Sequence, residues 1–162
     1  MDSGDYPRRE LFDDCDPSPE GVVARLDSAA WGELAWLARR IAEHAGPFGC
    51  WATPRDDDGR LEGFAYPETV PLVADVGDFC YQRGLVLAGF RWTEWDRGQE
   101  LVSADTAVSV AEVPARVVLA LLTVAIRGER FSTGAVLGAF ESGLIPRLLK
   151  RLLEFASEKS RD

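Results

Sequence analysis

Two arginines and two hydroxyl side chains follow the most apolar segment of the chain in close succession. A tight turn within residues 123–134 joins that segment to the expected start of a helix. The first amides of a helix have no partner inside the helix, so such a start can hold a phosphate or a carboxylate. Guanidinium groups beside it would add charge-assisted hydrogen bonds. The candidate anion-binding residues are therefore Arg127, Arg130, Ser132 and Thr133.

A structural interpretation of the same turn competes with the anion site, and the sequence favours it. Arg127 can donate to carbonyl groups at the end of the preceding helix. Arg130 can pair with Glu129 or Glu141. Ser132 would then only cap the following helix with its hydroxyl group. On this interpretation the turn binds no ligand.

A second candidate is a helix-turn-helix-like pair over residues 132–155, because small residues and a turn approximate the spacing of that motif. Against it, Ser142 stands where an apolar residue would help, and Pro146 begins the supposed recognition helix. The net charge of −9 also disfavours a nucleic-acid partner, which usually binds proteins with a basic excess. A solvated basic face on a core helix is therefore favoured. The candidate nucleic-acid-binding residues are Arg147, Lys150 and Arg151.

A third candidate is a protein interface on the last two helices, where small residues and leucines recur. Small residues on a helix face allow another backbone to come close. A G-x-x-x-G spacing is specific only in membranes, so packing within the domain is the favoured explanation of the glycines. Any interface here would receive a protein partner or a second copy of the chain. The candidate interface residues are Gly134, Gly138, Leu148 and Leu152.

The sequence contains no recognisable motif for catalysis, metal binding or cofactor binding. The run Asp56-Asp57-Asp58-Gly59 lacks the alternating ligands and the closing glutamate of a calcium loop. His44 is the single histidine, and no acid or cysteine is spaced to form a triad or a metal set with it. The sequence therefore predicts no catalytic residue, no metal and no cofactor, and it favours a non-enzymatic protein.

The elements that would position these candidates are mostly helical. Apolar residues recur at three- and four-residue spacing over residues 27–45 and again over residues 69–83, which predicts two amphipathic helices. Residues 114–127 are apolar almost all round, which predicts a helix buried by neighbours on several sides. This segment is expected to be the central element of the fold.

Shorter elements complete the expected architecture. A short helix should run from Ser132 to Glu141, and a leucine-rich helix should begin at Pro146. Residues 50–66 hold proline, glycine and acidic residues between aromatic ones, which predicts a loop or a short irregular hairpin. The fold class is therefore mainly α, an irregular helical bundle with at most a small β element.

Composition sets the domain organisation. Residues 1–20 combine prolines with acidic residues and show little apolar periodicity, so they are predicted to form a mobile acidic tail. Residues 21–158 are predicted to form a single helical domain. The start of the chain lacks a signal-peptide pattern, and no apolar segment reaches the roughly 18 residues of a membrane span. The three cysteines are widely separated, which is typical of reduced thiols, so a cytoplasmic protein without membrane contact is expected.

A family resemblance rests on two short motifs. The run Leu122-Thr123-Val124-Ala125-Ile126-Arg127-Gly128-Glu129-Arg130-Phe131-Ser132-Thr133-Gly134, followed by Gly143-Leu144-Ile145, resembles the signature of an uncharacterised bacterial family known only as a domain of unknown function. The aromatic segment 90–95 also resembles that family. The resemblance implies a small helical domain and brings no activity, substrate or catalytic residue.

The sequence thus favours a non-enzymatic helical domain that acts through contacts with another protein or as a homodimer. Two alternatives stay open. One is a DNA-binding regulator that uses residues 132–155, with nucleic acid as the less favoured partner. The other is an anion- or phosphate-binding domain at the turn from Arg127 to Thr133.

Overall fold

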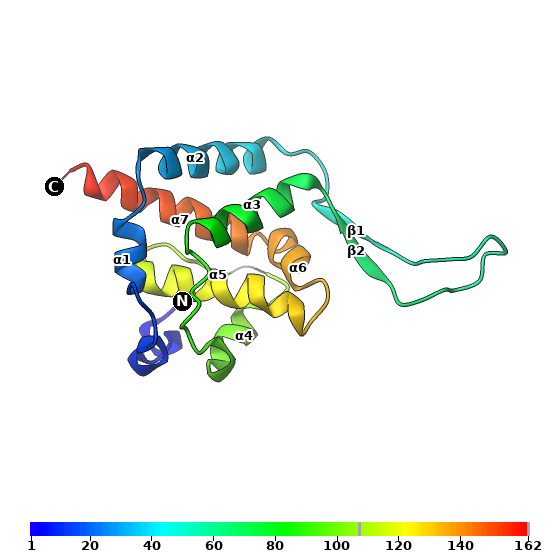
Figure 1. Ribbon diagram of the computed structural model, residues 1–162, viewed down its shortest axis with the longest axis horizontal. Helices are drawn as coiled ribbons and strands as arrows, with labels where there is room; N and C mark the ends of the chain where they lie inside the picture. Colours follow the sequence, from blue (N-terminus) through cyan, green and yellow to red (C-terminus); the bar gives the residue numbers. More distant parts are fainter. Residues whose placement is uncertain (107, 162) are drawn as a thin grey trace.

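The computed structural model describes residues 1–106 and 108–161, which form a mainly helical protein with one small sheet (Figure 1). The predicted fold class is therefore confirmed. Short 3-10 turns accompany the α-helices, for example at Ser3–Asp5 and Arg9–Phe12. The α-helices are α1 (Pro19–Ala24), α2 (Ser28–Glu43), α3 (Pro71–Gln82), α4 (Asp96–Val102), α5 (Ala115–Arg127), α6 (Ala135–Glu141) and α7 (Leu144–Lys159).

Helix α5 lies at the centre of the fold, as its composition predicted. Every residue from 117 to 126 is buried, and α1, α4, α6 and α7 all pack against this helix. Thr123 is the one polar side chain in that run, and its hydroxyl group is satisfied twice. It donates to the Leu119 carbonyl at 2.7 Å and accepts from the Leu87 amide at 2.9 Å. The second bond joins α5 to the connector that follows α3.

Helices α2 and α7 form the layer beside α5. In Figure 1 the three helices run side by side, with α7 between α2 and α5. The Asp27 carboxylate accepts from the Ala30 amide at 2.8 Å and caps α2. Helix α7 begins at Leu144, two residues before the predicted start at Pro146. Proline is tolerated there because the first turn of a helix has amides without intrahelical partners.

A two-stranded hairpin leaves this helical body. Strand β1 (Gly49–Ala52) pairs antiparallel with β2 (Tyr66–Thr69), and an isolated bridge joins Arg55 to Leu61 beyond them. The hairpin and its long loop extend away from the helices in Figure 1. We call residues 49–69 the arm. The sequence predicted either a loop or a short irregular hairpin here, and the structure shows the hairpin.

The N-terminal segment packs against the body, which differs from the mobile acidic tail expected over residues 1–20. Leu11 and Phe12 are buried, and the Phe12 ring stacks on Phe90 with centroids 4.6 Å apart. The Arg91 amide also donates to the Leu11 carbonyl at 3.0 Å. These two adjacent apolar side chains anchor the segment although acidic residues surround them in the sequence. The expectation differed because their contact partners lie far along the chain.

Candidate functional site

The turn after α5 is closed by a carboxylate that the sequence analysis had assigned to another role. Glu129 accepts from the Gly134 amide through Oε1 and from the Val136 amide through Oε2, each at 2.8 Å. Gly134, in the left-handed region with φ of 91°, is the N-cap of α6. Ser132 was predicted to cap this helix, but α6 starts three residues later at Ala135.

This arrangement changes what the candidate anion-binding residues can do. The Glu129 carboxylate occupies the amides that a phosphate would otherwise accept from, and its negative charge would repel a second anion. Arg127 is half-buried and reaches the Ala88 carbonyl at 3.5 Å, while Arg130 is exposed. Ser132 and Thr133 are exposed as well. The geometry therefore favours the structural interpretation of this turn, and the anion site stays a prediction.

The predicted partners of Arg130 are engaged by backbone groups instead. Glu129 takes the two amides at the start of α6, and Glu141 accepts from the Phe48 amide at 2.8 Å. The second bond fixes the end of α6 to the segment that leads into the arm. Both acids thus hold the backbone in place.

The basic residues of α7 differ in exposure. Arg147 and Lys150 are exposed, whereas the Arg151 side chain is mostly covered. Arg151 donates to the Val113 carbonyl at 3.0 Å and pairs with Glu154 at 2.7 Å and Glu158 at 3.3 Å. Because two acids neutralise this guanidinium, it is poorly suited to hold a phosphate of DNA. No observation favours the DNA-binding alternative, which stays a prediction.

The four candidate interface residues are not on one surface. Leu148 and Leu152 are completely buried within the chain, so they contribute to its own core. Gly134 faces the arm, because a Cβ atom at this position would collide with the indole of Trp51. Gly138 faces open space instead, with no heavy atom within 4 Å of a Cβ atom built there.

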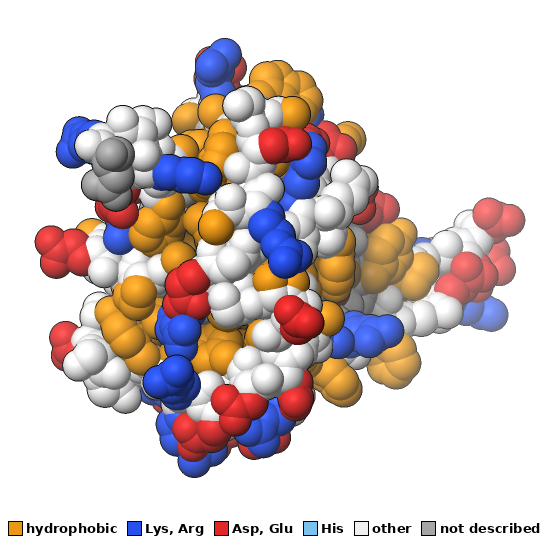
Figure 2. Space-filling model, turned by 60° about the vertical axis from the view of Figure 1, so that its left-hand side comes forward, with side chains coloured by type: hydrophobic (Ala, Val, Ile, Leu, Met, Phe, Trp, Pro, Cys, Tyr) orange, Lys and Arg blue, Asp and Glu red, His pale blue; other side chains and the backbone are white. Residues whose placement is uncertain are grey.

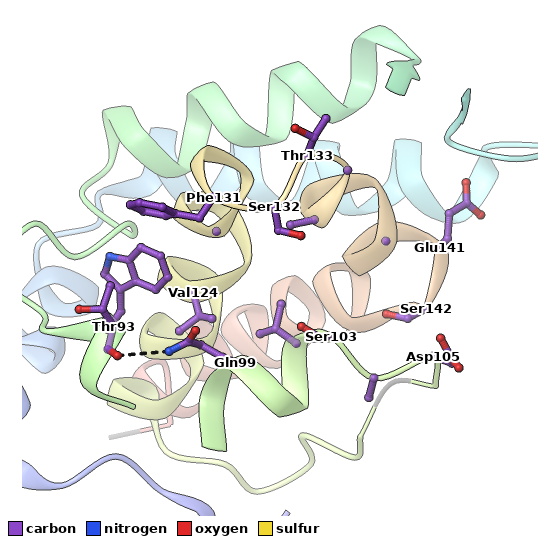
Figure 3. Close-up of a pocket in the computed structure, with 17 residues that line it drawn as sticks. Thr93, Gln99, Ser103, Asp105, Val124, Phe131, Ser132, Thr133, Glu141 and Ser142 are labelled. Carbon is purple, nitrogen blue, oxygen red and sulfur yellow. Dashed lines mark hydrogen bonds between the residues drawn. The ribbon is translucent and has the colours of Figure 1, made fainter. Parts of the chain in front are cut away.

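The open space beside Gly138 is a pocket of about 690 Å³ between α4, the end of α5 and α6 (Figure 3). Ser132 and Thr133 line it, but Arg127 and Arg130 do not. Sequence reasoning missed this pocket, because its walls come from two stretches that are separated along the chain, residues 92–105 and 124–142.

The arm is the other feature that sequence reasoning missed. The large apolar side chains that it exposes are Trp51, Leu61, Phe64 and Tyr66. In the sequence they resemble core residues, since apolar side chains near a loop give no sign of their exposure. One indication of their exposure was present in the sequence: these residues lie outside the segments in which apolar residues recur at helical spacing.

Acidic side chains gather at the free end of the arm, where they hold a turn (Figure 2). Asp56 Oδ1 accepts from the amides of Asp58 at 3.0 Å and Arg60 at 2.8 Å. Among the described residues, no group of three His, Cys, Asp or Glu side chains is placed to hold a metal ion. His44, the single histidine, lies 3.0 Å from the Pro47 carbonyl and stacks on Phe48.

Three groups with a shifted pKa belong to the packing of the fold. Burial raises the pKa of the Cys80 thiol to about 12. A hydrogen bond from Arg97 lowers the pKa of the Asp5 carboxyl below its ordinary value, and one from Arg116 does the same for Glu20. These two ion pairs connect the N-terminal segment and α1 to the body, so they stabilise the fold above the ordinary carboxyl pKa and lose that effect as the pH falls.

Comparisons with known proteins give a family and no activity. The sequence model of the family of unknown function (DUF6508) matches residues 26–158. No curated protein and no solved structure matches the chain. Over the residues described, none of the helices has the length and apolar character needed to cross a membrane.

Proposed function

Because the chain belongs to the DUF6508 family, whose function is unknown, we propose a function from its geometry. The chain is a non-enzymatic domain that acts through protein–protein contacts. The arm makes those contacts. The proposal goes beyond family membership, which brings no activity. The sequence predicted the contact surface on the last two helices, whereas we now propose the hairpin as that surface.

The observation that carries the proposal is the exposure of large apolar side chains along the arm. Four of the seven exposed large hydrophobic side chains of the described chain lie there, namely Trp51 (54%), Leu61 (63%), Phe64 (96%) and Tyr66 (44%). Burying one such side chain in a partner is worth about 1.5–3 kcal/mol. Aromatic anchors are also the residues that most often dominate binding energy at interfaces.

The base of the arm is held firmly by the body, which favours binding without a large ordering cost. The Trp51 ring lies against Gly134, and the Phe48 ring packs on Phe140 with centroids 5.2 Å apart. The Glu141 carboxylate fixes the Phe48 amide. An isolated two-stranded hairpin is marginal in water, so these contacts support its position.

We take a second copy of the chain as the partner. Each strand of the sheet pairs on one edge only, which leaves edges that another strand can extend. Pro67 lacks an amide proton and weakens the β2 edge for this purpose, whereas β1 contains no proline. Antiparallel pairing of two β1 strands about a twofold axis satisfies the symmetry of a closed dimer.

Cys50 in the middle of β1 provides the test. It is exposed, while Cys15 is half-buried and Cys80 is buried. Twofold pairing of β1 strands brings the two Cys50 thiols close together, so mild oxidation of the purified chain should give a disulfide-linked dimer. Cys50→Ser should abolish that product, and Cys80→Ser should leave it unchanged. In the cytoplasm, the location that the sequence predicted, the thiols would stay reduced.

Sedimentation equilibrium provides the independent measurement. We expect a reversible dimer of the reduced wild-type chain and a shift towards monomer in the double variant Leu61→Ser, Phe64→Ser. A matched control is Trp36→Ser, because Trp36 is a large apolar side chain, 51% exposed on α2 and outside the arm. A reduced chain that stays monomeric up to about 1 mM would contradict a second copy as the partner.

A further inference from the structure

The pocket between α4, α5 and α6 has a different character from the arm and points to a different kind of ligand. Its volume of about 690 Å³ lies within the range of small-molecule sites, about 300–1,000 Å³. Figure 3 shows it open between the α4 helix and the turn that carries Phe131, Ser132 and Thr133. The arm plays no part in its walls.

One end of the pocket is aromatic. Trp92 and Phe131 both line it, and their rings lie at an angle with centroids 5.7 Å apart. Trp92 is buried at 9% exposure, whereas Phe131 is 78% exposed. An aromatic face of this kind stacks on flat apolar groups and also attracts cations.

The opposite side is acidic. Figure 3 places Asp105 and Glu141 across the pocket from Phe131. These two are the charged side chains among the residues that line the pocket in the described chain, and both are carboxylates. One oxygen of Glu141 accepts from the Phe48 amide at 2.8 Å, and Phe48 is not among the described residues that line the pocket, so this carboxylate adds negative charge at the rim.

Helix ends reinforce this negative character. Ser103 and Ser142 line the pocket and directly follow the last residues of α4 and α6. The C-terminal end of a helix carries partial negative charge on its unpaired carbonyl groups. The start of α6 also borders the pocket, but the Glu129 carboxylate already occupies its amides.

The space between the two ends is kept open by small residues. Gly138 lies on the wall formed by α6, where a Cβ atom would point into open space. Val124 and Ala135 add apolar surface. The walls therefore suit a ligand with a flat apolar body, and the negative charge around them favours a positively charged group on that ligand.

We propose that this pocket binds a small organic cation with an aromatic body, whose ring lies against Trp92 and Phe131 and whose ammonium group pairs with Asp105. The inference does not depend on the arm or on the oligomeric state. Neither the family match nor the sequence motifs assign any ligand to this region.

Three probes of similar shape test the charge preference: 4-phenylbutylamine, 4-phenylbutanol and 5-phenylpentanoate. Isothermal titration calorimetry of the full chain should show the amine binding at least about tenfold more tightly than the carboxylate, with the alcohol between them. Equal affinities for the amine and the carboxylate would overturn the proposal. So would the absence of saturable amine binding below a Kd of about 1 mM.

Two variants place the binding in the pocket. Gly138→Leu fills the open space and should weaken amine binding at least about tenfold, whereas Gly32→Leu should not. Gly32 is the matched control because it is an exposed helical glycine of α2, also with open space around its Cβ position. Circular dichroism melts establish that both variants fold, and Gly138→Ala is the milder substitute. Amine binding that persists in folded Gly138→Leu would overturn the location.

The acidic side has its own test. Asp105→Asn should weaken binding of 4-phenylbutylamine severalfold and leave binding of 4-phenylbutanol unchanged, because the variant removes a charge and keeps the shape. Asp57→Asn, in the exposed tip of the arm, is the matched control and should alter neither affinity. An equal loss for the amine and the alcohol would mean that Asp105 acts only on the shape of the pocket, which contradicts the proposed ion pair.

Discussion

Helix α5 and the arm use apolar side chains in opposite ways. Every residue of α5 from 117 to 126 is buried, and its neighbours are other helices of the same chain. The arm exposes Trp51, Leu61, Phe64 and Tyr66, and its strands pair only with each other. Helix α5 stabilises the fold by its burial, whereas the arm, on our proposal, would bind a partner at little cost to that stability. Substitutions in the two regions should therefore change different measurements.

The largest loss of stability should come from Leu121→Ala in α5. Leu121 has no exposed surface, so the truncation removes buried apolar area and leaves a cavity. We expect the free energy of unfolding to fall by about 2–5 kcal/mol in urea titrations at constant m-value. A loss below about 1 kcal/mol would mean that α5 relaxes around the gap and is less rigid than its burial indicates.

A second loss should follow Glu129→Ala, at the turn that ends α5. The variant leaves the Gly134 and Val136 amides without their acceptor, which should cost about 1–3 kcal/mol of stability. Phosphate should then raise the melting temperature of Glu129→Ala and not of the wild type, because the vacated amides can donate hydrogen bonds to an anion. Glu43→Ala, at an exposed position at the end of α2, is the control. A phosphate-dependent rise in the wild type would revive the anion site at this turn.

The buried hydroxyl of Thr123 should contribute a loss of similar or smaller size. Thr123→Val keeps the shape but leaves the Leu87 amide without a partner, which should cost about 1–3 kcal/mol. Thr123→Ser keeps the hydroxyl group and should lose only the transfer energy of one methyl group, about 1 kcal/mol. Thermal unfolding of both variants measures the difference. If valine proved no worse than serine, the bond between α5 and the connector would carry no net stability.

The central helix was predictable because its own residues decide its environment. The segment 117–126 is apolar on every side, and such a helix must be surrounded by protein. The start of α6 was predicted wrongly, because the sequence rule assigned the cap to a nearby Ser132. The actual acceptor is Glu129, whose side chain reaches amides five and seven residues away across a turn.

Regions that depend on distant partners were not predictable. Leu11 and Phe12 are surrounded by charged residues in the sequence, and their burial depends on Phe90, far along the chain. The apolar residues of the arm have the same types as core residues, and only the path of the hairpin decides their exposure. The pocket walls likewise meet only after α4, α5 and α6 have packed.

Two glycines, the N-cap of α6 and one within that helix, sharpen the comparison with a smaller effect. Gly138→Ala should raise stability by about 0.5–1 kcal/mol, because its Cβ position is open and alanine favours a helix. Gly134→Ala should lower stability, because a φ of 91° disfavours a side chain and the new Cβ atom would collide with Trp51. Melting temperatures of the two variants should therefore move in opposite directions. A higher melting temperature for Gly134→Ala would contradict both the strain at this φ and the contact with Trp51.

The smallest effect on stability, and the most informative one, is expected for Phe64→Ser in the arm. Phe64 is 96% exposed, so the substitution removes almost no contact within the chain. The free energy of unfolding extrapolated to the monomer should change by less than about 0.5 kcal/mol, against about 2–5 kcal/mol for Leu121→Ala. The dimer dissociation constant should rise, because an aromatic anchor that becomes buried in a partner contributes through that burial. Denaturation at several protein concentrations separates the two quantities, since only association makes the midpoint depend on concentration. A Phe64→Ser chain with unchanged dimerisation would show that this side chain lies outside the interface, whereas a large loss of monomer stability would place it in the core that α5 organises.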